Sequence, residues 1–172
     1  MDILDVLKNR RSCRKFSSKE VEEGKIKKVI EAGLYAPSGK GKQAPIFIVI
    51  TNNEMIKRLS RLNASIMGNP DVDPFYGAPC VIVVLSSKDV PTFVYDGSLS
   101  LGNMMNEAES IGLSSIWIHR AKEEFESAEG KQILKELGIE GDYEGIGHCC
   151  LGYGLDNPVC KSRNPNRVFY VR

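Results

Sequence analysis

The sequence predicts an α+β fold, an α/β/α sandwich with helices flanking a central mixed, largely antiparallel sheet. Helical and strand patterns interleave along the whole chain. The two most apolar runs, 45–51 and 78–87, are short and rich in β-branched residues, which is typical of buried strands. The 172 residues contain no repeat and no low-complexity segment. This length suits one domain with its own core, spanning residues 1–172.

The first two helices are expected within residues 1–9 and 16–39. Residues 1–9 place apolar side chains at helical spacing and lead into a basic cluster. In the second segment, Ser17 and Glu20 form the Ser-x-x-Glu pattern of a capping box, which predicts the start of the helix. The Pro-Ser-Gly sequence at its end predicts the stop.

The remaining elements follow from the same periodicities. Helices are expected at 53–66, 91–112 and 122–139, and strands at 45–51, 78–87, 113–119, 144–154 and 167–172. The helix at 91–112 is apolar over much of its surface, so it should be largely buried. The last strand, "RVFYVR", follows a connector rich in Pro and Asn. We expect it at a sheet edge or on a neighbouring subunit.

Composition and charge exclude several classes of protein. With 23 basic and 22 acidic residues the net charge is +1, so no nucleic acid or membrane partner is expected. The N-terminus lacks the apolar region of a signal peptide. The five cysteines form no C-x-x-C pair, which favours reduced thiols and a cytoplasmic location. With only two histidines, no metal site of familiar spacing is present.

Residues 8–15 concentrate positive charge with no acidic residue among them. Three arginines and two lysines surround Ser12. Such a cluster repels itself unless water screens it or an anion binds in it. Arginine suits a phosphate because its planar fork can bind two oxygens, and a serine hydroxyl adds a short donor. Taken alone, however, the segment is better explained as a solvated helix end, where basic residues are favoured.

Two further segments suit the same anion. Residues 36–45 hold glycines, prolines and a serine that can bring backbone N–H groups close to a ligand, although the P-loop spacing is missing. Within them Gln43 can read the edge of a heterocycle. Near the C-terminus, Gly152-Tyr153-Gly154 precedes Lys161 and Arg163 but lacks the third glycine of a Rossmann motif. Together, the three segments predict a site for one phosphorylated heterocycle.

These segments resemble the nitroreductase-like FMN-dependent flavoproteins, in particular their short members. "RRSCRKF" is similar to the R-R-S-x-R-x-[FY] opening of that family, and "APSGKGKQAPIFIVI" is similar to its A-P-S-x-x-x-x-Q-P-[WF]-x-[FI] segment. The pair Lys161 and Arg163 matches a basic pair near the family's C-terminus. The resemblance implies non-covalent FMN and a homodimer with two shared sites. It also implies that the C-terminal strand is exchanged between subunits.

The resemblance also implies roles for the matching residues. The arginines and serine of residues 10–12 would hold the FMN phosphate with the C-terminal basic pair. Arg14 would face the N1/O2 edge of the isoalloxazine ring, where its charge stabilises the reduced flavin. Residues 37–39 and Gln43 would reach the flavin from the other subunit. The implied cofactor-binding residues are Arg10, Arg11, Ser12, Arg14, Pro37, Ser38, Gly39, Gln43, Asn63, Lys161 and Arg163.

The function implied by the resemblance is hydride transfer from NAD(P)H, through flavin N5, to a nitroaromatic or quinone by a ping-pong mechanism. No catalytic protein residue is required. Two alternatives remain open: a non-catalytic FMN-binding or storage protein, and a family member with different flavin chemistry.

Three other features have competing explanations. We expect His148 and the Cys149-Cys150 pair to be packed strand residues rather than proton donors or redox thiols. In the loop around Phe75, an aromatic side chain would serve either as a substrate contact or as a hydrophobic anchor. The family's Pro-x-Glu-Gly stretch has no clear counterpart after "WIHRAKEEF", residues 117–125, so the backbone of residues 117–119 is the candidate to replace it.

Overall fold

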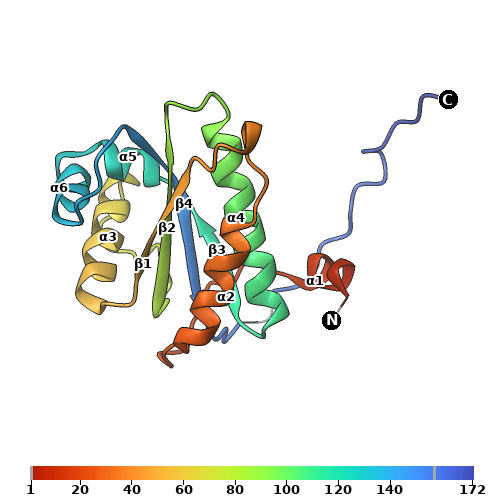
Figure 1. The fold of residues 1–172 in the computed structure, drawn as a ribbon. Coiled ribbons are helices and arrows are strands. Elements are labelled where there is room, and N and C mark those ends of the chain that lie inside the picture. Colours follow the sequence, from red (N-terminus) through yellow and green to blue (C-terminus); the bar gives the residue numbers. More distant parts are fainter. Residues whose placement is uncertain (1, 157) are drawn as a thin grey trace.

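In residues 2–156 and 158–172, which the computed structural model describes, helices and strands alternate (Figure 1). The helices are α1 (Ile3–Asn9), α2 (Glu23–Leu34), α3 (Asn53–Ile66), α4 (Phe93–Ser110), α5 (Ala121–Glu126) and α6 (Ala128–Glu136), with a 3-10 turn at Gly39–Gly41. The strands are β1 (Pro45–Ile50), β2 (Cys80–Ser87), β3 (Ser114–Ile118) and β4 (Tyr143–Gly152). No helix in these ranges is both long and apolar enough to cross a membrane.

The four strands form one sheet in the order β1-β2-β4-β3. All three strand pairs are antiparallel. Within the described ranges, the one parallel pairing is an isolated bridge between Ser12 and Ser115. The predicted α+β class is therefore confirmed, and β1 and β3 are left as the edges of the sheet.

Helices cover both faces of the sheet. In Figure 1, α2 and α4 lie on one side and α3, α5 and α6 on the other. Successive side chains of a strand point to opposite faces, and β2 shows this clearly. Val81 and Val83 join the core under α3, whereas Ile82 and Val84 join the core under α4. A strand buried on both faces reads as a continuous apolar run, and this is the pattern that predicted β2.

A β-bulge in β4 sets which side chains face which core. Val84 pairs with Gly147 and Leu85 with Gly145, so Ile146 is the extra residue between them. Ile146 and Cys149 consequently both lie in the core under α4. Beyond the bulge, the side chain of His148 reaches the opposite face.

The predicted start of the second helix is wrong by several residues. The helix α2 begins at Glu23, and its N-cap, Glu22, makes no capping hydrogen bond with its side chain. The hydroxyl of Ser17 instead accepts a hydrogen bond from the backbone N–H of Lys19. The Ser-x-x-Glu pattern therefore forms a local turn ahead of the helix.

The helix predicted at 122–139 is two helices with a break at Ser127. Ser127 has extended backbone angles (φ −68°, ψ 160°) and therefore ends α5. Its hydroxyl then accepts a hydrogen bond from the N–H of Gly130 at 3.0 Å, which caps α6. The periodicity continues across the break, which is why the sequence suggested a single helix.

Residues 158–172 run away from the body of the domain (Figure 1). They form no strand, and the rings of Phe169 and Tyr170 are 87% and 78% exposed. The fifth strand predicted at 167–172 is therefore absent within one chain. Its exchange with a second subunit stays a prediction.

Candidate functional site

The N-terminal basic segment lies between the start of β3 and the chain that leaves β4. The N–H of Cys13 donates to the carbonyl of Ser115 at 3.1 Å, next to the bridge between Ser12 and Ser115. On the other side, the N–H of Leu155 donates to the carbonyl of Lys15 at 2.8 Å. These bonds bring the first segment beside the beginning of the third, as the sequence interpretation requires.

Three buried polar atoms near this segment have no partner among the described residues. They are Nη1 of Arg10, the hydroxyl oxygen of Ser115, a residue that is 2% exposed, and Oδ1 of Asp156. Ser115 pairs with Leu151, which belongs to the core under α4, so the Ser115 hydroxyl lies on the α4 side of the sheet. Buried donors without acceptors are costly and rare. The Arg10 and Ser115 donors are therefore suited to an anion, although Ser115 was not among the residues predicted from the sequence.

An acidic side chain enters the basic segment from a distant part of the sequence. The backbone N–H of Arg14 donates to Oδ2 of Asp156 at 2.7 Å. The neighbouring Cys13 thiol, together with this N–H, holds the pKa of Asp156 below its ordinary value. The bond fixes the backbone of Arg14 and leaves its guanidinium exposed, at the edge of the segment.

The other predicted phosphate ligands are less constrained. The Nη1 group of Arg11 donates to the carbonyl of Arg10 at 2.6 Å. Both Lys161 and Arg163 are exposed in the tail, where Nη1 of Arg163 donates to the carbonyl of Lys161 at 3.0 Å. No described contact joins these two residues to Arg10 or Ser12, so their place in the phosphate site stays a prediction.

The loop at residues 36–43 is attached to the start of α4. The N–H of Gly39 donates to Oδ1 of buried Asp96 at 3.1 Å, and the hydroxyl of Thr92 donates to Oδ2 at 3.0 Å. A Cβ at Gly39 would lie 2.1 Å from Oγ1 of Thr92, so only glycine fits. The N–H of Gln43 donates to the hydroxyl of Ser38, which closes the loop. The side chains of Pro37 and Gln43 are exposed.

The basic segment and this loop lie at opposite ends of α4 (Figure 1). The loop contacts Asp96 near the helix start, whereas α1, which leads into the basic segment, packs beside Asn106 and Glu107. Eleven residues of helix separate Asp96 from Glu107, which is about 16 Å. The single chain therefore does not bring the two predicted halves of the site together.

Asn63 is fully buried, contrary to the expectation that it contacts the flavin ring. Its Nδ2 donates to the carbonyl of His119 at 2.8 Å and to Oε1 of Glu124. Because no part of it is accessible, it offers no surface to a flavin. Ile56 and Leu59 mark the buried face of α3, and Asn63 lies one turn further along it. This position was the sequence signal for its burial.

The histidine and cysteine predictions are confirmed. His148 is fully buried in β4, and Cys149 and Cys150 are both buried and free. The two thiols belong to opposite cores, so they face away from one another. Burial raises the pKa of both thiols. This is the environment of structural cysteines rather than reactive ones.

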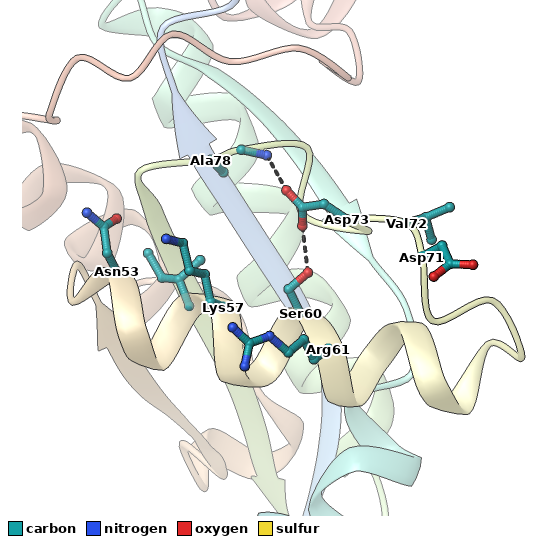
Figure 2. A pocket seen from close by; sticks show the side chains of 10 residues that line it. Asn53, Lys57, Ser60, Arg61, Asp71, Val72, Asp73 and Ala78 are labelled. Atoms are coloured by element: carbon teal, nitrogen blue, oxygen red, sulfur yellow. Dashed lines mark hydrogen bonds between the residues drawn. The ribbon is translucent and has the colours of Figure 1, made fainter.

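A groove of about 480 Å³ lies between α3 and the loop at residues 71–78 (Figure 2). Asp73 holds this loop, since its carboxylate accepts hydrogen bonds from the hydroxyl of Ser60 and from the N–H groups of Phe75 and Gly77. Phe75 is fully buried, which identifies it as a hydrophobic anchor. None of the predicted flavin-binding residues lines this groove.

Residues 7–153 match the sequence model of the Nitroreductase family. Two archaeal proteins named "Putative NADH dehydrogenase/NAD(P)H nitroreductase" are similar to this chain. The protein from Methanothermobacter thermautotrophicus is 35% identical over 126 residues, which cover 68% of this chain but 60% of that protein. The protein from Archaeoglobus fulgidus is 28% identical over 156 residues, covering 90% of this chain and 87% of the relative.

Two solved structures show the same fold. A nitroreductase with bound FMN from Bacteroides fragilis superposes with a TM-score of 0.89 at 23% identity. A nitroreductase with bound FMN from Desulfitobacterium hafniense gives 0.89 at 24% identity. Each comparison covers 100% of both chains, including the segment after β4. By its sequence match and its fold, the chain belongs to the Nitroreductase family.

Proposed function

We propose that this chain is an FMN-dependent oxidoreductase that transfers hydride from NAD(P)H, through flavin N5, to a nitroaromatic or quinone acceptor by a ping-pong mechanism. Family membership and the names of the two archaeal relatives support the reaction class. The FMN in two structures of the same fold supports the cofactor. The observation that carries the proposal is the buried, partnerless Nη1 of Arg10 within the matching motif.

The residues of the basic segment fit the phosphate of FMN. Arg10 supplies a buried donor without a described acceptor, and Ser12 lies beside it at the start of an edge strand. A phosphate oxygen would satisfy the guanidinium with a charge-assisted hydrogen bond, which is stronger than a neutral one. Lys161 and Arg163 would add charge from the tail.

A second copy of the chain would complete the site, because the loop at residues 36–43 lies too far from Arg10 within one chain. The surface around α1 and α4 is apolar enough to suit such a partner, since Ile3 and Tyr35 are 75% and 81% exposed and line one groove there. The exposed rings of Phe169 and Tyr170 would be buried by the same association. We therefore propose a homodimer with two shared sites and exchanged tails.

When bound, FMN supplies the redox chemistry, accepting electrons from the nicotinamide and passing them to the acceptor. The protein contributes binding, orientation and charge. Arg10 and Ser12 would hold the phosphate end, and the loop with Ser38 and Gln43 of the second subunit would contact the ring end. The exposed guanidinium of Arg14 would offer positive charge to the N1/O2 edge of the ring, where it would stabilise negative charge. No protein nucleophile or general base is needed for these roles.

The direct test is an absorbance spectrum of the purified protein, repeated anaerobically after addition of NADH or NADPH. We expect oxidised-flavin bands that bleach within the first turnover with one of the nucleotides and return when a nitroaromatic or a quinone is added. Flavin that stays oxidised with both nucleotides would contradict the reductase function. A protein that takes up no FMN even on incubation would contradict the cofactor assignment as well.

A further inference from the structure

Three fully buried polar side chains meet on the α3 side of the sheet, away from Arg10. Oε2 of Glu124 lies 2.7 Å from Nε2 of His148, and Oε1 accepts a hydrogen bond from Nδ2 of Asn63. All three side chains have no exposed surface. A carboxylate in such a place is stable only when it is paired and hydrogen-bonded. Glu124 therefore depends on Asn63 and His148.

The same network binds two consecutive backbone carbonyls at the end of β3. Nδ2 of Asn63 donates to the carbonyl of His119 at 2.8 Å, and Nδ1 of His148 lies 3.3 Å from the carbonyl of Ile118. A carbonyl only accepts, so Nδ1 is the donor in this contact, while Nε2 faces the carboxylate of Glu124. The next residue, Arg120, has a left-handed backbone (φ 76°). The turn at residues 118–120 is thus held from its inner side.

The network is sealed from water by a loop and a helix. The ring of Phe75 lies 5.0 Å from the ring of His148, and Asp73 holds the Phe75 loop onto α3 through Ser60 (Figure 2). At the other side, a Cβ at Gly145 would lie 2.1 Å from the carbonyl of Ala121, so α5 sits directly on β4. Hydrogen bonds are stronger in such dry surroundings, and the turn is correspondingly rigid.

The edge strand β3 connects this turn to the proposed phosphate site. Of the described residues, only Ser12 and Cys13 pair with the outer edge of β3, and both do so at Ser115. From Ser115 to His119 is about 13 Å of strand. A cofactor whose phosphate is held at Arg10 and Ser12, and which runs along the open edge, would place its other end at the turn.

We propose that Asn63, Glu124 and His148 are positioning residues that hold the turn at residues 118–120 against the isoalloxazine ring. This proposal rests on the proposed function, because it requires that the protein binds FMN. It adds three residues that touch neither cofactor nor substrate and act through the backbone of the turn.

The test compares four variants of the full-length chain with the wild-type protein. Asn63→Ala and Glu124→Ala remove bonds of the network, whereas Glu124→Gln keeps the shape and the hydrogen-bonding capacity of the side chain. Glu123→Ala is the matched control, because Glu123 is exposed on the same helix. Hydrogen exchange at the amides of residues 118–121, measured without FMN, reports on the turn. The visible absorption band and the midpoint potential of bound FMN report on the ring.

We expect exchange at the turn to be about tenfold faster in Asn63→Ala and Glu124→Ala than in the control, the effect of losing a hydrogen bond. Both variants should keep FMN, because the phosphate contacts are intact, yet shift its absorption band and its midpoint potential. Glu124→Gln should restore slow exchange. If Glu124→Ala does not fold, Asn63→Ala and Glu124→Gln decide the test.

Two results would overturn the inference. Unchanged exchange in Asn63→Ala would show that the network does not hold the turn. Faster exchange with an unshifted flavin would show that the turn does not face the ring, while leaving the proposed function intact. A wild-type protein that binds no FMN would instead end the proposed function and the ring assignment together.

Discussion

The buried polar groups on the two faces of the sheet differ in whether they have hydrogen-bond partners. Under α3, the carboxylate of Glu124 and the imidazole of His148 find partners within the chain. Toward the α4 side, the hydroxyl of Ser115 is buried without a partner among the described residues, and so is Nη1 of Arg10, a half-buried residue that follows α1. The first face thus satisfies most of its buried polar groups within the chain; Oδ1 of Asn63 is the exception. In the proposed site a ligand would satisfy the Arg10 donor and, because the loop at residues 36–43 lies at the far end of α4, a second subunit would complete it.

The largest effect is expected from disrupting the buried network of Asn63, Glu124 and His148 under α3. Glu124→Ala leaves Nε2 of His148 without its buried partner and removes one of the two acceptors of Asn63 Nδ2, so the free energy of unfolding should fall by about 3–5 kcal/mol. Urea unfolding measures this, with Glu123→Ala expected to change stability by less than about 0.5 kcal/mol. Equal stability of the two variants would mean that this network does not stabilise the folded state.

A smaller effect, on FMN binding rather than on stability, is expected from removing the side chain of Arg10. Arg10→Ala removes a charge-assisted phosphate contact of about 1.5–3 kcal/mol, so FMN should bind roughly 10- to 150-fold more weakly. Fluorescence titration of the protein with FMN measures this. Lys8→Ala is the control, because Lys8 is an exposed basic residue of the same segment. An affinity reduced equally by both substitutions would point to general charge rather than to the Arg10 donor.

The loop at residues 36–43, which is proposed to contact the second subunit, gives a third comparison. Gly39→Ala places a methyl group against Thr92, which should cost about 1–3 kcal/mol in thermal or urea unfolding. The double variant with Thr92→Ala makes room and should recover much of the loss. Gly24→Ala has open space around it and should be neutral or mildly stabilising. A Gly39→Ala protein as stable as Gly24→Ala would show that the loop is not tightly held.

The smallest effect concerns an exposed carboxylate outside both faces. The hydroxyl of Tyr153, helped by Lys19, lowers the pKa of Glu22 from 4.5 to about 2. A lowered pKa stabilises the folded state above pH 4.5, and this contribution is lost as the pH falls toward 2. In Tyr153→Phe the pKa of Glu22 should rise toward 4.5, measured by NMR titration. An unchanged pKa would exclude the Tyr153 hydroxyl as its main cause.

The sequence predicted the elements whose signals are local. The strand β2 was predictable because burial on both faces requires a continuous apolar run. The helix α3 was predictable because burial of one stripe repeats apolar residues at helical spacing. The capping box failed because Glu22, not Ser17, precedes the first helical turn. The break at Ser127 was missed because the helical period continues through it.

The site was predictable only in part, because much of it depends on contacts between distant residues. Arg10 and Ser12 are marked by their motif. The approach of Asp156 to Arg14 spans 142 residues and leaves no local pattern. Ser115 is an ordinary strand residue until its lack of a partner is seen. The family resemblance implied a flavin contact for Asn63, but Asn63 lies on the buried face of α3 and points into the core.

The central claim is that one site is built from two subunits, and mixing two defective variants tests it most directly. Arg10→Ala and the double variant Ser38→Ala/Gln43→Ala should each bind FMN poorly as homodimers. After unfolding and refolding together, half of the dimers should be hybrids with one intact site. About a quarter of all sites should then regain wild-type FMN affinity. No recovery on mixing would contradict the shared site and place the whole of it within one chain.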